Sequence, residues 1–162
     1  VIQDVPTQEY RNVQREASIQ LLQGDLAGSG WSMMINVTRP PGDDVRVRQA
    51  LQWGVDKAAM VRAVWLGVHK PACSPITSTM FGFDPATCGI YRYDPKKAGD
   101  LLDEAAWKIG PGGVRRKDGQ DLTLALYYRS DNPDFAAMAT FLQSMYQQIG
   151  IKIDLQGPAQ PG

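Results

Sequence analysis

Several features that would define a class of function are scarce or missing in this sequence. The longest apolar segments fall well short of the roughly 18 residues that a membrane span needs. Lysine plus arginine and aspartate plus glutamate number 17 each, so no net positive charge favours binding to nucleic acid. No Gly-x-Ser-x-Gly elbow, phosphate-binding loop or His-Glu metal pair is present. We therefore predict neither an enzyme with catalytic residues nor a nucleic-acid-binding protein.

Metal and cofactor sites have equally little support in the sequence. His69 is the only histidine, and Cys73 and Cys88 are the only cysteines. One histidine without a clustered carboxylate or thiolate is weak evidence for a metal ligand, and two cysteines make at most half of a tetrahedral site. We predict no metal and no cofactor, and a solvated or structural role for His69.

The composition that remains is typical of one soluble globular domain. The chain has 162 residues, of which 43% are hydrophobic, enough for a single core and few for two. It starts at Val1, and its first residues lack the basic and apolar regions of a signal peptide. We expect a piece of a longer protein.

Two consecutive helices are predicted after a proline-rich stop at residues 39–42. Asp43 or Asp44 would cap the first helix, and the apolar residues that follow recur at helical spacing up to Gly67, where a left-handed residue can end the second helix. Asp94 and the proline after it open a further helix.

The C-terminal third predicts a strand, a helix and a second parallel strand at residues 122–128, from 131 or 132 to 148, and 151–155. The turn signal Asp118-Gly119 predicts a hairpin that pairs residues 114–117 with residues 122–128. Nearer the N-terminus we expect a helix within residues 6–16, and two paired strands at residues 18–22 and 31–38.

An ordered series of motifs accompanies these elements. The motifs are DDVRVRQAL at residues 43–51, MFGFDP at 80–85, YDPKKA at 93–98, KDG at 117–119 and QIGIKI at 148–153. In this order they resemble the extracytoplasmic solute-binding proteins of peptide and nickel ABC importers, known as solute-binding family 5. The resemblance covers roughly residues 16–155, and it implies an α/β fold: a lobe of the type II periplasmic-binding-protein class, with a mixed sheet, a C-terminal parallel β-α-β unit and flanking helices.

The resemblance also sets the expected organisation and role. Residues 1–15 would be an N-terminal helical segment or boundary, residues 16–156 one lobe, and residues 157–162 a linker. The whole protein would hold a small solute between two lobes and deliver it to ABC permease subunits. It would act as a monomer in the periplasm or otherwise outside the cytoplasm, with or without a lipid anchor ahead of Val1. An oligopeptide is the first choice of solute, and a nickel complex or an oligosaccharide are alternatives. A ligand-sensing domain of the same fold in a receptor or regulator is the alternative function.

The two cysteines enclose a loop rich in proline, threonine, serine and glycine. Two unrelated thiols would be the expectation for a cytosolic protein. Since extracytoplasmic proteins use disulfides to fix long loops, we predict a Cys73–Cys88 disulfide.

Ligands of parallel α/β sheets gather beyond the carboxyl ends of the strands. That position is the loop at residues 129–134, where a cation, a hydroxyl group, an amide and free backbone N–H groups at the start of a helix could hold a carboxylate. An ordinary capping loop is the alternative. Some dipeptide-binding relatives have two arginines where this chain has Ala136 and Ala137, which argues against a dipeptide preference. Two aromatic residues of the cysteine-bracketed loop are further candidates for ligand contact. The predicted ligand-binding residues are Arg129, Ser130, Asn132, Asp134, Phe81 and Phe83.

Overall fold

A computed structural model of the chain describes residue 5, residues 9–22, residue 24 and residues 30–157. The chain divides into two compact units, which are described separately. The first unit comprises Val1–Ser32 and Lys57–Ile90, and the second comprises Met33–Asp56 and Tyr91–Gly162. The assignment of residues 16–156 to one lobe stays a prediction.

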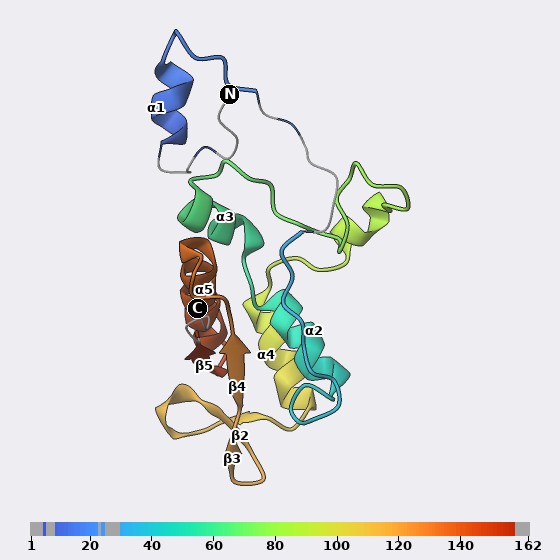
Figure 1. Cartoon of the computed structure of the whole chain (residues 1–162). Helices are drawn as coiled ribbons and strands as arrows, with labels where there is room; N and C mark the ends of the chain where they lie inside the picture. Colours follow the sequence, from blue (N-terminus) through green and yellow to red (C-terminus); the bar gives the residue numbers. More distant parts are fainter. Residues whose placement is uncertain (1–4, 6–8, 23, 25–29, 158–162) are drawn as a thin grey trace. The chain divides into compact units, whose positions relative to one another are not determined.

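In the second unit, helices α2 (Val45–Trp53) and α4 (Pro95–Glu104) lie side by side (Figure 1). Their facing sides bury small and branched apolar residues, among them Val47 and Leu102, which are both 0% exposed. Both helices begin at an aspartate whose side chain accepts a hydrogen bond from a backbone N–H of the first turn, Asp44 in α2 and Asp94 in α4. The predicted helix starts are therefore confirmed.

The second unit also contains the predicted strand-helix-strand segment. Strand β4 (Thr123–Tyr127) leads into helix α5 (Pro133–Gln148), and strand β5 (Lys152–Gln156) returns parallel to β4 with Leu124 opposite Ile153. On α5 the most buried residues are Ala139, Met145 and Tyr146. Since β4 and β5 run in the same direction, their carboxyl ends lie at one edge of the pair.

A small antiparallel sheet precedes β4 and corrects part of the hairpin prediction. Its strands, β1 (Lys108–Ile109), β2 (Arg115–Lys117) and β3 (Gln120–Asp121), are ordered β1-β2-β3, with the short 3-10 helix η2 (Pro111–Gly113) between the first two. Asp118 and Gly119 form the predicted turn with φ of 51° and 80°. A two-residue turn places residue 117 opposite residue 120, so β2 forms its ladder with β3, and of the expected partner segment 122–128 it is Leu122, the first residue, that hydrogen-bonds to β2.

The environment of Leu122 explains why the β2–β3 ladder ends before this residue. Its side chain is 0% exposed, its N–H donates to the carbonyl oxygen of Arg115 and its own carbonyl accepts from the N–H of Lys152. Leu122 therefore connects the two sheets at the point where the chain enters the core, and the fold combines antiparallel and parallel pairing in separate sheets.

In the first unit, the described elements are α1 (Tyr10–Arg15), α3 (Lys57–Trp65) and the 3-10 helix η1 (Pro85–Gly89). The predicted N-terminal helix is present as α1, and the part of the prediction at residues 6–8 lies outside the described residues. Helix α3 ends where Leu66 and Gly67 adopt left-handed φ values of 51° and 79°, as expected for a glycine C-terminus.

The strands predicted at residues 18–22 and 31–38 are absent from the structure, although both segments are described. A strand exists only through its pairing partner, and the described backbone hydrogen bonds give neither segment one. Local bonds occur instead: the N–H of Ile19 donates to the carbonyl of Glu16, and the side chain of Asn36 accepts from Thr38.

Candidate functional site

The loop at residues 129–134 lies at the carboxyl edge of β4, as the sequence predicted. The N–H of Tyr128 still donates to the carbonyl of Gln156 at 3.0 Å, so Arg129 is the first residue beyond the ladder. The side chain of Asn132 caps α5 by accepting from the N–H of Asp134 at 2.9 Å, and Pro133 occupies the first helical position. Both ends of the loop are thus fixed by hydrogen bonds, one between backbone groups and one to the side chain of Asn132.

Arg129 and Asp131 form a two-point ion pair within this loop. Nε of Arg129 donates to Oδ1 of Asp131 at 3.1 Å, and Nη2 donates to Oδ2 at 2.8 Å. The two side chains are 63% and 42% exposed. The hydrogen bonds that Arg129 donates lower the pKa of Asp131 below its usual value, and the same bonds raise the pKa of Arg129. The pair therefore stays charged, with its cation accessible to solvent.

The other predicted residues of the loop have more local roles. Asn132 is the helix cap, and Asp134 is half-buried in the first turn of α5. The backbone N–H groups of Asp134 and Phe135 donate to the side chain and carbonyl of Asn132, so the expectation that these N–H groups are free is wrong. Ser130 is exposed beside the pair. The guanidinium of Arg129 is an accessible cation of this loop that could bind an anion.

Phe81 and Phe83 belong to the first unit, in the loop closed by the disulfide. The predicted Cys73–Cys88 bond is present, with a Cα–Cα distance of 4.6 Å. Phe81 is fully exposed at 103%, and Phe83 is half-buried. Since the loop at residues 129–134 belongs to the second unit, this loop and the two phenylalanines are separate candidates for ligand contact.

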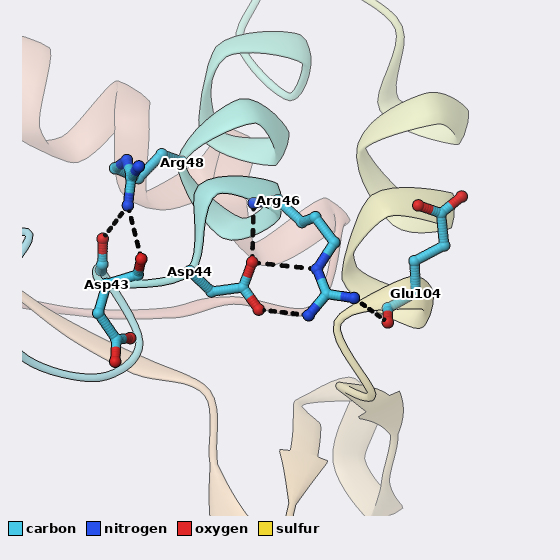
Figure 2. A network of polar contacts seen from close by, with 6 residues as sticks. Asp43, Asp44, Arg46, Arg48 and Glu104 are labelled. Atoms are coloured by element: carbon cyan, nitrogen blue, oxygen red, sulfur yellow. Dashed lines mark hydrogen bonds and ion pairs between the residues drawn. The ribbon is translucent and has the colours of Figure 1, made fainter.

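The DDVRVRQAL motif forms a polar network at the start of α2 (Figure 2). Asp44 caps the helix and also pairs with Arg46, whose Nη2 lies 2.7 Å from its Oδ2. Nη1 of Arg46 donates to the carbonyl of Glu104 at the end of α4, and Nη1 of Arg48 donates to the carbonyls of residues 42 and 43 at 2.8 Å each. The hydrogen bond from Arg46 lowers the pKa of Asp44. These bonds are satisfied within the protein, so the motif holds α2 to α4 and does not offer a ligand site.

Arg115 is a buried cation that the sequence analysis missed. It is 5% exposed, its Nε donates to the carbonyl of Ile149 at 2.9 Å, and its Nη1 donates to Oδ1 of Asp103 at 2.9 Å and to the carbonyl of Trp107 at 2.6 Å. Partial desolvation acts to raise the pKa of Asp103, but its bonds to Arg115 and Lys108 prevail and lower it. The role of Arg115 is structural.

Two hollows of the second unit were also not predicted. One, of about 250 Å³, lies between residues 33–42 and β4 and is lined mainly by apolar side chains, including Leu51, Leu124 and Tyr146. The other, of about 520 Å³, lies between the turn before α2 and the β2–β3 hairpin, and is lined by Trp107, Lys117 and several carboxylates. Because the hairpin precedes β4, the second hollow is at the amino end of the strand, opposite the loop that carries Arg129.

Within the described part of the chain, no group of three or more His, Cys, Asp and Glu side chains could hold a metal ion. His69 contacts the edge of Trp65, with ring centroids 5.6 Å apart. No helix in the described ranges is long and apolar enough to cross a membrane.

Comparisons with known proteins identify the family. The profile of the bacterial extracellular solute-binding proteins, family 5 Middle, matches residues 1–161. This chain belongs to that family. The family 5 relatives include a dipeptide-binding protein of Escherichia coli, 33% identical over 89% of this chain and 25% of its own length, and heme-binding protein A of Haemophilus influenzae, 34% identical over 89% and 25%. The oligopeptide-binding protein AppA of Bacillus subtilis, solved with a nonapeptide, has 27% identity and a TM-score of 0.77 over 96% of this chain and 31% of that one.

These relatives establish the type II periplasmic-binding-protein-like fold for this chain. They are named as binding proteins and not as enzymes. The chain spans about a quarter of the length of the curated relatives that it matches.

Proposed function

We propose that the full-length protein containing this chain is the extracytoplasmic solute-binding component of an ABC importer. It captures a small solute between two lobes and delivers it to the permease as a monomer. The observation that carries the proposal is membership of an extracellular solute-binding family along nearly the whole chain. Relatives named for binding a dipeptide and heme, and one solved with a nonapeptide, support a solute with polar and apolar parts. An oligopeptide fits that description best, and a nickel complex or an oligosaccharide remain the alternatives.

Lobe closure supplies the mechanism. A solute that contacts both lobes only in the closed state shifts the equilibrium towards that state, because its contacts there have no counterpart when the lobes are apart. A permease that recognises the closed form would then receive loaded protein only. No covalent chemistry is needed, which agrees with the proposed non-enzymatic role.

Within this chain we assign the solute contact to the loop at residues 129–134. The side chain of Arg129 is 63% exposed at the carboxyl edge of a parallel strand pair, where ligands of α/β sheets collect. Arginine and the adjacent hydroxyl of Ser130 suit a carboxylate. Phe81, fully exposed on the disulfide-closed loop of the first unit, stays a separate candidate for contact with an apolar group.

The test begins with the full-length protein purified from its host, whose co-purified solute is identified by mass spectrometry. Binding of that solute is then compared by calorimetry in the wild type, in Arg129→Ala and in Arg92→Ala. Arg92 is the matched control, since it is an exposed arginine of the same unit outside the loop. Charge-assisted hydrogen bonds contribute about 1.5–3 kcal/mol, so we expect Arg129→Ala to weaken binding about tenfold or more and Arg92→Ala to leave it unchanged. Equal affinities of the three proteins would remove Arg129 from the site.

A further inference from the structure

The ion pair between Arg129 and Asp131 uses one defined edge of the guanidinium. Both bonds come from the Nε and Nη2 side, at 3.1 and 2.8 Å. A guanidinium has five N–H groups in a fixed plane, and this arrangement leaves both hydrogens of Nη1 and the outer hydrogen of Nη2 without a bond to Asp131. One hydrogen of Nη1 and the outer hydrogen of Nη2 form the end-on edge, whose spacing matches the two oxygens of a second carboxylate.

Asp131 is itself well placed to orient the arginine. It lies between the end of the β4 ladder, where Tyr128 is bonded to Gln156, and the helix cap Asn132, so the chain is anchored three residues before it and at the next residue after it. A free arginine side chain at 63% exposure would sample many rotamers. Immobilising such a side chain at an interface costs about 0.5–1.5 kcal/mol, which corresponds to roughly twofold to twelvefold in affinity. A partner that orders the side chain before the ligand arrives avoids much of that loss.

We propose that Asp131 is a positioning residue that holds Arg129 with its end-on edge open, so that the site grips a planar carboxylate of the solute. The inference rests on the proposed function, and it adds the ligand chemistry and the residue that prepares the site. It also predicts how binding of the carboxylate depends on salt concentration. Because the pair is neutral as a whole, selectivity for an anion comes from short-range bidentate contact and depends little on salt.

Asp131 also repels a carboxylate ligand that approaches Arg129, and an upper limit can be set for this repulsion. The ligand and Asp131 would sit on different edges of the guanidinium, so their repulsion acts across solvent-exposed space. After screening at physiological ionic strength, it weakens binding by about twofold or less. We expect the benefit of positioning to exceed that repulsion, and the excess to grow as salt suppresses the charge term.

The experiment uses the full-length protein and variants of Asp131. Asp131→Ala removes the positioning group, and Asp131→Glu restores the charge on a longer arm. Asp118→Asn is the matched control, because it removes one negative charge in the β2–β3 turn, and asparagine tolerates the left-handed φ of 51° found there. The ligand probes are trialanine and trialanine amide, which differ only in their terminal carboxylate.

The first readout needs no ligand. In wild-type protein, hydrogen exchange of the Arg129 Nε–H, followed by NMR, should be about twofold to fivefold slower than in Asp131→Ala, the range given by an exposed ion pair. An Arg129→Lys sample assigns the signal. If exchange at this Nε–H is the same in wild type and Asp131→Ala, the positioning role is wrong, whatever the protein transports.

The second readout is calorimetry of both probes at about 0.15 M and about 0.5 M salt. We expect wild type to bind trialanine more tightly than trialanine amide. Asp131→Ala should lose about threefold to tenfold of that preference at both salt concentrations. Asp131→Glu should recover part of the preference, and Asp118→Asn should match wild type. A preference that is kept or increased in Asp131→Ala would show that Asp131 competes with the ligand and would overturn the proposal. A wild type that binds neither probe, or both equally, would overturn carboxylate recognition, while the solute-carrier function is judged separately by the co-purified solute.

Discussion

Removing the buried cation Arg115 should loosen the core around α4 and the small antiparallel sheet. The side chain is 5% exposed and donates to the carbonyl oxygens of Ile149 and Trp107, two residues that are 4% and 8% exposed. Methionine at this position would fill much of the same volume but leave both acceptors without a donor. Each orphaned buried acceptor costs about 1–3 kcal/mol, partly offset because the charge no longer has to be desolvated. We expect Arg115→Met to cost about 2–4 kcal/mol.

The ion pair of Arg115 with Asp103 should matter much less than these carbonyl bonds. Asp103 is 44% exposed and also pairs with Lys108 at 3.3 Å, so it keeps water and a cation when Arg115 is removed. Asp103→Asn should therefore cost about 0–1 kcal/mol, the range of exposed pairs. The contrast between the two variants measures whether Arg115 acts through the backbone or through its charge.

Native-state hydrogen exchange of the full-length protein resolves this contrast locally. The amide of Leu122 reports on the region, because it donates to the carbonyl of Arg115 at 2.7 Å. A loss of about 2–4 kcal/mol would accelerate its exchange roughly 30-fold to 900-fold in Arg115→Met, and Asp103→Asn should change it less than about fivefold. Equal acceleration in both variants would refute the reasoning, since the ion pair would then be the dominant contribution.

Three further predictions concern the backbone, the disulfide and pH. Gly150→Ala should destabilise the protein by about 1–3 kcal/mol in urea unfolding, because Gly150 has φ of 83° and an added Cβ would lie 3.1 Å from a backbone carbonyl oxygen; a change below about 0.5 kcal/mol would contradict the strain. Reduction of Cys73–Cys88, which are 15 residues apart, should lower stability by about 3 kcal/mol by the chain-entropy estimate, measured as the urea midpoint with and without reductant, and an unchanged midpoint would count against it. The hydrogen bond from Arg46 lowers the pKa of Asp44, so the Asp44 charge stabilises the fold above its unfolded-state pKa of about 4, and this stabilisation is lost as pH falls through the lower folded-state pKa. The difference in unfolding free energy between wild type and Asp44→Asn should therefore shrink from pH 7 towards acid. A difference that stays constant with pH would show that the charge is not involved.

Local signals in the sequence predicted the helices and the parallel unit well. Asp44 and Asp94 cap their helices through bonds to residues two or three positions away, and the periodicity that leads to α5 lies within one continuous segment. The parallel pairing of β4 and β5 follows from the length of the crossover between them. In these cases the interaction that determines the structure joins residues close together in the sequence, so a local sequence pattern is enough to predict it.

The missed elements depend on contacts that the sequence does not display. Residues 18–22 and 31–38 have strand-like patterns, but the structure supplies no partner strand within its described ranges. Arg115 is buried because three groups distant in the sequence converge on it, which no local pattern encodes. For the candidate site, the sequence predicted the loop and its arginine. The pairing with Asp131, two residues away, was overlooked, although the short separation of opposite charges was visible.

The loop at residues 129–134 is the part of this chain that we assign to the solute site. The most direct test is hydrogen–deuterium exchange mass spectrometry of the full-length protein, with and without its identified co-purified solute. We predict that the solute slows exchange in peptides covering residues 128–136, while peptides covering the β2–β3 hairpin at the amino end of β4 are unchanged. Slowed exchange elsewhere in the protein, with none at residues 128–136, would contradict this assignment of the site.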